Sequence, residues 1–250
     1  MNTLRARIIP SLLMENGSLI KTKQFKEAKY VGDPINTVKI FNEKKVDELT
    51  IFDIGAWKKA EPNFKLLEKI SNEARMPLCY GGGIKSQDHA ARIIGLGFEK
   101  ISISRQALLQ ATLVEEIASR VGAQSTVITL DVKKKITNFG WDIFTDNGEK
   151  RFSEDLDMLL SQLPLNSVGE LIINSIDREG LMSGYDLELA KFVANRVGVP
   201  ITMLGGAGSP EHMSALIREI GIVGAAAGSM FVFKGIHRAV LINYIRPIVI

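Results

Sequence analysis

The sequence predicts an α/β fold, a single (β/α)8 barrel over residues 1–250 that is built from two related halves. Short apolar runs alternate eight times with helix-like segments, which is typical of a parallel sheet covered by helices. A chain of 250 residues with 46% apolar content can bury one core of this size. Two smaller domains are the alternative, but no long polar linker divides the chain.

The two halves share a glycine-rich turn, over residues 81–84 and 205–208, each of which follows an apolar run and opens into a helix-like segment. Residues 48–53 also resemble residues 170–175 at an offset of 122. A repeat of this length is far longer than a solenoid repeat, so a duplicated half-domain is the better interpretation, and it favours a closed barrel over an open sheet. At an offset of 123, identical residues meet in four pairs: Gly82 and Gly205, Gly83 and Gly206, Ser86 and Ser209, His89 and His212.

Each element is predicted from its local pattern. Buried strands are short and mostly apolar, and helices carry apolar residues three or four positions apart. Asp33 and Pro34 supply the N-cap and first residue of the first helix. Strands are expected over residues 7–13, 48–54, 78–80, 100–103, 126–132, 170–174, 201–204 and 224–227. Helices are expected over residues 34–45, 63–74, 86–96, 112–121, from about 153, over 186–196 and 209–220, and in a last segment ending near 245.

Two connections interrupt this alternation. Residues 14–31 form a long segment with four lysines, and loops of this length are usually lids, binding loops or disordered. Residues 133–151 contain two short β-like runs around an Asn147-Gly148 turn, which predicts a hairpin.

Composition excludes several classes of function. The net charge of +3 and the lack of a basic cluster with interleaved aromatics argue against a nucleic-acid partner. No segment approaches membrane-spanning length and no signal peptide is present, so no membrane partner is expected. The single cysteine, Cys79, lies in an apolar run and is expected to be a buried core residue, which fits a reducing cytosol and a cytoplasmic location.

Three aspartates, Asp53, Asp131 and Asp177, lie at or just beyond strand ends. Carboxylates at such places either cap the next helix and accept loop N–H bonds, or face the barrel mouth as acid or base groups. Asp131 is the sharpest candidate because it ends an apolar strand, and burial at the mouth would raise its pKa into the range used for acid and base catalysis.

Glycines at two strand ends predict two phosphate cradles, because unpaired N–H groups at a helix start attract anions and glycine permits close approach. The alternative is that these glycines only make turns. A ligand with a phosphate at each end would span the mouth. The first cradle comprises Gly82 and Gly83 with Ser102 or Ser104; the second comprises Gly180, Gly205, Gly206, Gly228 and Ser229.

Lys21 either closes over an anionic ligand or is a solvated charge. The three histidines, His89, His212 and His237, show no metal-ligand spacing and are expected on outer helices, so neither a metal nor another cofactor is predicted.

Four charged residues begin strands at the opposite end of the barrel: Arg7, Glu48, Lys100 and Glu170. Facing inward, they would form a ring of ion pairs across the barrel floor. Facing outward, they would be ordinary polar strand ends, which is the commoner case when nothing else is known.

Several of these motifs together resemble the cyclase (HisF) subunit of imidazole glycerol phosphate synthase, over nearly the whole chain. They are residues 47–53, 80–84, 100–103, 175–180, 183–186 and 205–208. The resemblance implies a barrel that docks a class I glutaminase (HisH-like) subunit on its N-terminal face. It also implies that ammonia crosses the barrel to a phosphorylated small-molecule ligand. In the family this ligand is the bisphosphate ribulosyl form of the aminoimidazole carboxamide intermediate of histidine synthesis. It is converted to imidazole glycerol phosphate and the carboxamide ribotide.

The resemblance assigns roles to individual residues. Arg7, Glu48, Lys100 and Glu170 match the family's charged ammonia gate, which reverses the outward interpretation given above. Lys21 matches the loop lysine, and Asp131 the strand-five catalytic aspartate.

One catalytic position departs from the family. Leu13 stands where the family has an aspartate at the end of strand one, and leucine cannot transfer a proton. Glu15 would replace it only if the strand continued that far, because facing alternates along a strand. The leading hypothesis is a paralogue that channels ammonia to a sugar amidotransferase making acetamidino groups on surface-polysaccharide precursors. The alternatives are an authentic cyclase and a non-catalytic scaffold for the glutaminase.

Overall fold

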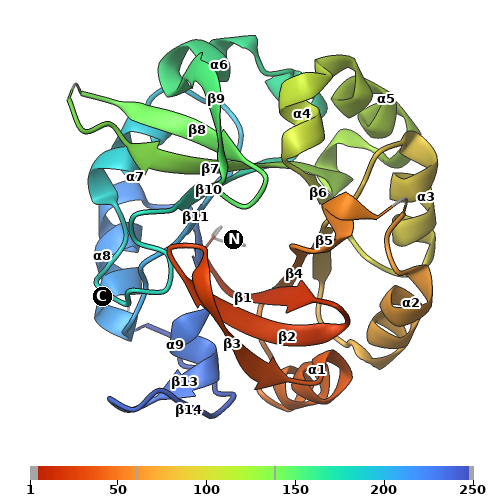
Figure 1. Cartoon of the computed structure of the whole chain (residues 1–250), viewed down its shortest axis with the longest axis vertical. Coiled ribbons are helices and arrows are strands. Elements are labelled where there is room, and N and C mark those ends of the chain that lie inside the picture. The colour runs from red at the N-terminus through yellow and green to blue at the C-terminus, as the bar shows by residue number, and fades with distance from the viewer. Residues whose placement is uncertain (1–4, 60, 138, 248–250) are drawn as a thin grey trace.

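The computed structural model describes residues 5–59, 61–137 and 139–247, and within them eight parallel strands close into a barrel (Figure 1). Around the barrel each strand pairs with the next, and β10 pairs with β7 to complete the ring. The predicted (β/α)8 barrel is therefore confirmed. In spatial order the strands are β1 (Arg7–Glu15), β4 (Leu49–Asp53), β5 (Leu78–Gly81), β6 (Lys100–Ile103), β7 (Thr126–Lys134), β10 (Glu170–Ser175), β11 (Ile201–Leu204) and β12 (Gly224–Ala227).

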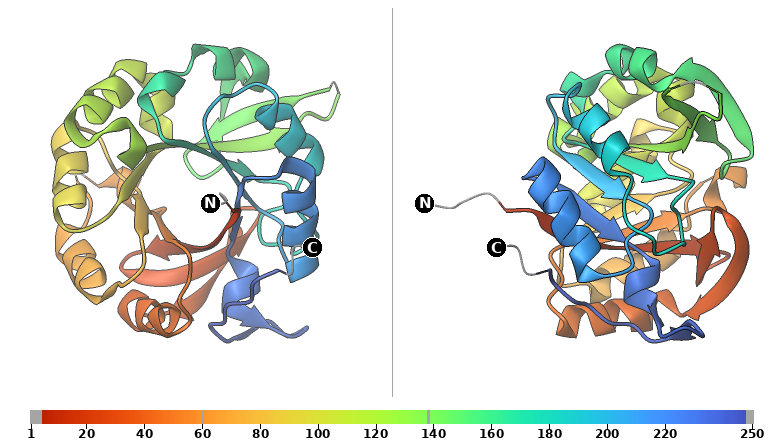
Figure 2. Two further views of the ribbon diagram at one scale, coloured as in Figure 1. Left: turned by 180° about the vertical axis from the view of Figure 1, so that it is seen from behind. Right: turned by 90° about the vertical axis from the view of Figure 1, so that its left-hand side faces the viewer.

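Helices surround the barrel, as Figures 1 and 2 show. Side-chain caps explain where several begin: a carboxylate or amide oxygen of Asp33, Asn63 or Asp186 accepts a backbone N–H three residues ahead. Such caps are worth about 1 kcal/mol each. The longer helices are α1 (Pro34–Glu43), α2 (Phe64–Glu73), α3 (Gln87–Gly95), α5 (Ala111–Val121), α6 (Leu156–Gln162), α7 (Leu187–Ala194) and α8 (Pro210–Ile220). Shorter turns are α4 (Arg105–Leu109), α9 (Ser229–Val232), η1 (Ala56–Lys58), η2 (Ala123–Ser125) and η3 (Leu165–Ser167).

The two halves repeat a hydrogen bond as well as a sequence. Nδ1 of His89, on α3, accepts the N–H of Lys85 at 3.4 Å, and Nδ1 of His212, on α8, accepts the N–H of Gly208 at 3.1 Å. Donor and acceptor are both displaced by 123 residues between the two pairs. The equivalent histidines therefore hold the glycine-rich turn against the following helix in each half.

The connection over residues 14–31 is a hairpin, and the expectation of a loop there was wrong. β1 continues to Glu15, turns at Asn16 and Gly17, and returns as β2 (Ser18–Lys23), which pairs with β3 (Lys26–Gly32). Asn16 and Gly17 have φ of +51° and +80°. An Asn-Gly pair adopts these values readily, so this turn could have been recognised from the sequence.

The second interruption is the predicted hairpin. β7 continues to Lys134, and β8 (Trp141–Thr145) and β9 (Lys150–Asp155) extend the sheet from it as antiparallel strands. In Figure 1 the β8–β9 turn projects over the centre of the barrel.

The predicted last helix was wrong. α9 spans four residues and is followed by β13 (Phe233–Lys234) and β14 (Ala239–Val240), so His237 lies in a hairpin turn rather than on a helix. Phe233 after α9 is extended, with φ of −122°, and Gly235 in the following turn has φ of +72°, so the chain leaves the helical conformation here. Residues 241–247 then run without regular structure toward the N-terminal end of the barrel, where the Tyr244 hydroxyl donates to the carbonyl of Ile8 at 3.1 Å (Figure 2).

Two apolar layers hold the fold together. The larger lies between the strands and the helices; the smaller fills the barrel interior with Cys79, Val127 and Ile172. Among the described residues, no helix is both long and apolar enough to cross a membrane.

Candidate functional site

A cavity of about 760 Å³ opens at the carboxyl ends of the barrel strands, where active sites of this fold are found. A second cavity of about 30 Å³ lies beside it. The predicted residues divide between them. Asp53, Gly82, Gly83, Ser102, Ser104, Asp131 and Asp177 line the large cavity; Lys21, Gly180, Gly205, Gly206, Gly228 and Ser229 line the small one.

Asp131 is the carboxylate best placed for acid and base chemistry. It lies near the end of β7, half-buried in the wall of the large cavity. Burial raises the pKa of Asp131 to about 6, although a hydrogen bond from Asn174 Nδ2 at 2.8 Å opposes the rise. A carboxylate with this pKa can both accept and release a proton near neutral pH.

Asn174 was not singled out in the sequence. It lies on β10, buried between the two cavities, and its Oδ1 is buried with no hydrogen-bond partner among the described residues. Its only signal in the sequence is a polar residue near the end of an apolar strand, which equally suits a loop contact.

Asp53 and Asp177 each accept a backbone N–H bond, which is the structural role given above as the alternative to catalysis. The Asp53 carboxylate is buried and accepts the N–H of Gly55 at 3.2 Å. Burial raises the pKa of Asp53, and the charge of Lys59 opposes it. The Asp177 carboxylate accepts the N–H of Lys134 at 2.7 Å, which joins the loop after β10 to the end of β7.

The glycines of the first predicted cradle are required by close packing. A side chain at Gly82 would lie 2.6 Å from the carbonyl oxygen of Asp53, and one at Gly83 would lie 2.8 Å from that of Ala56. Of the two serines, Ser102 contacts the hydroxyl of Thr129 at 2.6 Å inside the barrel, while Ser104 lines the large cavity.

The second predicted cradle is occupied by the chain's own side chains. Lys21 is buried and forms an ion pair with buried Glu179, and its side chain lies across Gly228. Arg238, from the turn between β13 and β14, donates to the Gly180 carbonyl at 3.1 Å and to the Ser229 hydroxyl at 3.2 Å. Glu179 and Arg238 were also missed in the sequence.

Close backbone contacts account for the glycines of this second cradle too. Side chains at Gly180, Gly205 and Gly206 would lie 2.3 Å from the Thr22 carbonyl oxygen, 2.6 Å from that of Ser175 and 2.1 Å from that of Gly184.

The strand-one position is apolar in the structure. Leu13, at the position where the resemblance implies an aspartate, lines both cavities. β1 does continue to Glu15, so Glu15 faces the same side and also lines the large cavity. Its charge contributes to the raised pKa of Asp53, which places the two carboxylates near one another.

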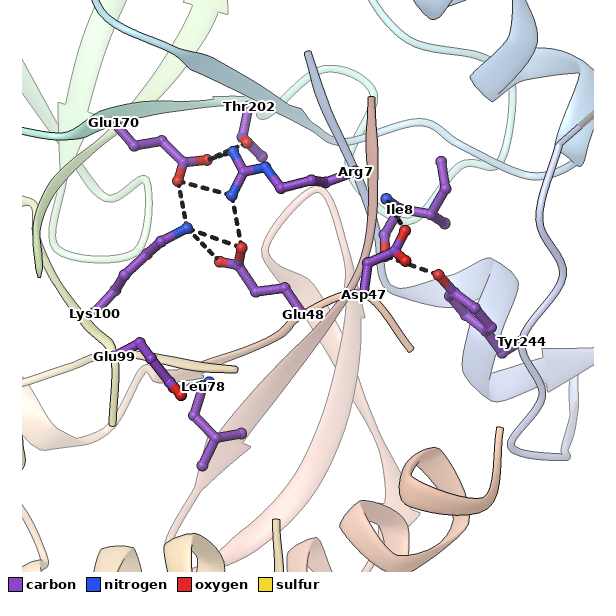
Figure 3. A network of polar contacts seen from close by, with 10 residues as sticks. All are labelled: Arg7, Ile8, Asp47, Glu48, Leu78, Glu99, Lys100, Glu170, Thr202 and Tyr244. Atoms are coloured by element: carbon purple, nitrogen blue, oxygen red, sulfur yellow. Dashed lines mark hydrogen bonds and ion pairs between the residues drawn. The ribbon is translucent and has the colours of Figure 1, made fainter. Parts of the chain in front are cut away.

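At the opposite end of the barrel the four predicted charges form a closed ring, shown in Figure 3. Arg7 contacts Glu48 at 2.6 Å and Glu170 at 2.8 Å, and Lys100 contacts each carboxylate at 2.8 Å. Each cation therefore bridges both carboxylates. Thr202 also donates a hydrogen bond to Glu170.

Three ring members, Arg7, Lys100 and Glu170, have pKa values shifted in favour of their charged forms. Burial lowers the pKa of Arg7 and of Lys100, but the two carboxylates outweigh this effect and the net pKa of each is raised. Burial raises the pKa of Glu170, but Arg7 and Lys100 outweigh it, so its pKa is lowered. The carboxylates are the more buried partners, at 6% and 4% exposed side chain against 31% for Arg7 and 19% for Lys100.

An apolar layer separates the ring from the mouth. Cys79, Val127 and Ile172 are buried there, and Phe52 and Leu204 pack against them. Burial, followed by the charge of Glu48, raises the pKa of Cys79 well above its ordinary value. Its thiol therefore stays neutral and serves as a small core residue, as expected.

Among the described residues, no group of three or more histidine, cysteine, aspartate or glutamate side chains is placed to hold a metal ion.

Comparison with known proteins agrees with this arrangement. A family model described as "Histidine biosynthesis protein" matches residues 7–237. The chain is 49% identical over 242 residues to a Leptospira borgpetersenii protein named "Putative imidazole glycerol phosphate synthase subunit HisF", covering 96% of this chain and 95% of that protein. It is 49% identical to a Vibrio vulnificus protein named as subunit hisF3 (98% and 94% covered) and 45% identical to a Pseudomonas aeruginosa protein named as subunit hisF2 (96% and 96%). The chain therefore belongs to the histidine biosynthesis protein family, among the HisF-like subunits of imidazole glycerol phosphate synthase.

Proposed function

We propose that this chain is the ammonia-receiving subunit of a class I glutamine amidotransferase, with a HisH-like glutaminase docked on its N-terminal barrel face. The observation that carries the proposal is the closed ring of Arg7, Glu48, Lys100 and Glu170 at that face. A ring of buried ion pairs contributes little net free energy to folding, because the cost of desolvating the charges offsets most of their attraction. Stability alone is therefore a weak explanation for the ring.

The layer above the ring suits neutral ammonia. Crossing Cys79, Val127 and Ile172 costs a neutral molecule little, whereas an ammonium ion would lose its hydration among apolar side chains. Because these side chains fill the interior, ammonia would cross by displacing them slightly. The more exposed cations, Arg7 and Lys100, are the ring members that can move aside with least loss of buried charge.

At the mouth, Asp131 would act on the arriving nitrogen or its acceptor. With a pKa near 6 it is mostly ionised at neutral pH and can take a proton from a nitrogen that attacks a carbon centre. The remaining mouth residues, including Asp53, Gly82, Gly83, Ser104 and Asp177, would contact the phosphorylated ligand or position the loops around it.

We propose further that the ammonia does not go to the histidine-pathway substrate. It goes instead to a sugar amidotransferase, which uses it to form acetamidino groups on a surface-polysaccharide precursor. Leu13 supports this, because ring closure needs proton-transfer groups on both sides of the ligand and loss of one costs a factor of about 100 to 10,000. Glu15 supports the alternative, an authentic cyclase, because it faces the cavity from the same strand.

The first experiment separates these two acceptors. The chain is incubated with excess ammonium salt and the family's bisphosphate substrate, and substrate loss is followed. An amidotransferase-serving paralogue leaves the substrate unchanged, whereas a cyclase consumes it. The Glu15→Gln variant, assayed in the same way, shows whether any turnover depends on the Glu15 carboxylate. Full conversion of the substrate by the wild-type chain would contradict the paralogue assignment.

The second experiment tests channelling, in the complex with its glutaminase and acceptor enzyme. With 15N-amide glutamine and excess 14N-ammonium, channelled product stays enriched in 15N. We expect Lys100→Ala to lower this enrichment severalfold, because the ring no longer directs nitrogen into the barrel. Lys191→Ala, which breaks an exterior ion pair with Glu219 at 2.7 Å, is the matched control. A wild-type product without 15N enrichment would leave only the scaffold function, and equal high enrichment in all three proteins would show that Lys100 does not direct the nitrogen.

A further inference from the structure

The small cavity beside the mouth is filled at the place where a second phosphate would bind. Lys21 lies across Gly228, with its Cε 2.7 Å from the position that a side-chain carbon on that glycine would take. The remaining space of about 30 Å³ holds one or two water molecules. A phosphate group could reach Gly228 and Ser229 only if the lysine left.

Glu179 holds the lysine in this place. Besides the ion pair with Lys21, its carboxylate accepts the Thr22 hydroxyl at 3.1 Å and the N–H of Phe25 at 3.2 Å, and its carbonyl accepts the N–H of Gln24 at 2.9 Å. These contacts fasten the whole β2–β3 turn to the loop after β10. Lys21 and Glu179 are both more than nine-tenths buried, so their pair is little weakened by solvent.

Neighbouring groups at the small cavity are already packed against, or hydrogen-bonded to, other residues of the chain. Gly180 packs so closely on Thr22 that a side-chain carbon would lie 2.3 Å from its carbonyl oxygen. The Gly180 carbonyl and the Ser229 hydroxyl both accept from Arg238. The cradle thus presents a neutralised lysine and a buried carboxylate, and the carboxylate repels an incoming anion.

We propose that Lys21 and Glu179 are specificity-determining residues that close the second cradle, so that the mouth takes ligands with no more than one phosphate group. This inference does not depend on ammonia transfer, since it concerns which anions the free chain binds. It predicts that Lys21 contacts no ligand phosphate while Glu179 is present.

Calorimetric titration with two probes, ribose 5-phosphate and ribulose 1,5-bisphosphate, tests the inference on the full chain. For the wild type we expect dissociation constants within about threefold of each other, because a second phosphate finds no site. Glu179→Gln keeps the size and acceptor oxygen of the side chain but frees the charge of Lys21. In this variant we expect the bisphosphate to bind about tenfold or more tightly than the monophosphate.

The double variant Lys21→Met with Glu179→Gln is the matched control, because it fills the cradle without charge. Its two dissociation constants should again agree within about threefold. A wild type that prefers the bisphosphate by tenfold, or a Glu179→Gln variant with no such preference, overturns the inference. If the wild type binds neither probe, Glu179→Gln must still bind the bisphosphate.

Hydrogen–deuterium exchange of residues 18–32 in the wild type gives a second readout that needs no variant. A closed cradle predicts that the bisphosphate changes this exchange no more than the monophosphate does, because both bind through one phosphate in the large cavity that residues 22 and 24–28 line. Exchange that rises severalfold with the bisphosphate alone would mean that the hairpin opens to admit the second phosphate, and would reject the proposal. Neither assay contains a glutaminase, so the result stands apart from the proposed ammonia transfer.

Discussion

At the scale of single residues, burial of the ionised Asp131 carboxylate lowers the free energy of unfolding. Its pKa is about 6 in the folded chain and 3.8 ordinarily, so the folded state binds more protons between these values. Raising the pH therefore destabilises the folded state from about pH 4 to pH 6, and the penalty is complete above pH 6. Carboxylates with such a penalty are frequent at functional sites.

We predict that Asp131→Asn lowers product formation by roughly 100- to 10,000-fold and stabilises the protein at pH 8 by on the order of 1 to 3 kcal/mol. The asparagine keeps an acceptor for Asn174 but carries no charge to bury. Urea unfolding at pH 5 and pH 8 measures the effect. The gap between variant and wild type should widen by on the order of 1 kcal/mol over this range. A gap that stays constant would show that the carboxylate is not perturbed.

Asn174→Leu is the companion variant for this measurement. It removes the hydrogen bond from Asn174 Nδ2, which favours the ionised form of Asp131. The pKa of Asp131 should therefore move further upward, as followed by carboxyl-carbon NMR titration. A midpoint that falls would mean that Asn174 does not act through this hydrogen bond.

Sequence reasoning found the strand-end residues but not their partners. The expected positions of Asp131, Asp53 and Asp177 are correct because strand ends are written in local patterns. Which group each carboxylate meets depends on segments 43 residues away for Asp131 and Asp177, and two residues away for Asp53. Only the partner of Asp53 could have been predicted from neighbouring residues, because Gly55 lies two positions ahead in the same turn.

At the scale of elements, the hairpin over residues 14–31 shows how a local signal can be outweighed. Asn16-Gly17 is a strong turn signal, but four lysines nearby made the segment resemble a solvated loop. Most of those lysines are exposed in the structure, whereas Lys21 is buried by an ion pair with a residue 158 positions away. The prediction of a final helix was wrong for a similar reason, since long-range contacts decide the structure there. Residues 241–247 are held by contacts with β1 and with the segment before β4.

The β8–β9 turn forms a roof over the mouth. Asp146 pairs with Arg105 at 2.9 Å, Asn147 Nδ2 donates to the Ile54 carbonyl at 3.1 Å, and Gly148 lies so close to Phe25 that a side-chain carbon would be 2.7 Å from its ring. The turn thus reaches α4, the end of β4 and the β2–β3 turn. Access to the large cavity depends on these contacts.

We predict that Asn147→Ala loosens this roof. One hydrogen bond is worth about 0.5 to 1.5 kcal/mol, so amide exchange over residues 141–155 should quicken by roughly 2- to 10-fold. Hydrogen–deuterium exchange with mass spectrometry measures this. Asn166→Ala, at an exposed position before β10, is the control and should leave the same peptides unchanged. Equal exchange in both variants would show that the turn is held by other contacts.

At the scale of the whole molecule, the barrel is tied at one end by charge and at the other by hairpins. The ring joins β1, β6, β10 and the residue before β4, across sequence separations of up to 163 residues. Residues 241–247 reinforce the same end, where Arg246 and Arg5 both contact Asp47, the neighbour of Glu48 (Figure 3 shows Asp47 beside the ring). The ring is therefore joined, through the neighbouring Asp47, to residues 5 and 246 at the N-terminal face.

We predict that Glu170→Gln destabilises the protein by about 3 kcal/mol at pH 7, since removing one partner leaves Arg7 and Lys100 to share Glu48 alone. Urea unfolding of variant and wild type measures the loss. Glu188→Gln, which breaks the exposed pair with Lys134 at 2.6 Å, is the control and should cost less than about 1 kcal/mol.

The loss caused by Glu170→Gln should also depend on pH in a defined direction. The folded-state pKa of Glu170 is lowered from 4.5, so its charge contributes fully above pH 4.5 and its contribution disappears as the pH falls through the lower, folded value. The gap between variant and wild type should be constant from pH 7 to about pH 5 and shrink below pH 4.5. A gap that persists unchanged in acid would mean that Glu170 acts through shape and hydrogen bonding, and the ring could not then serve as a charged barrier to ammonium.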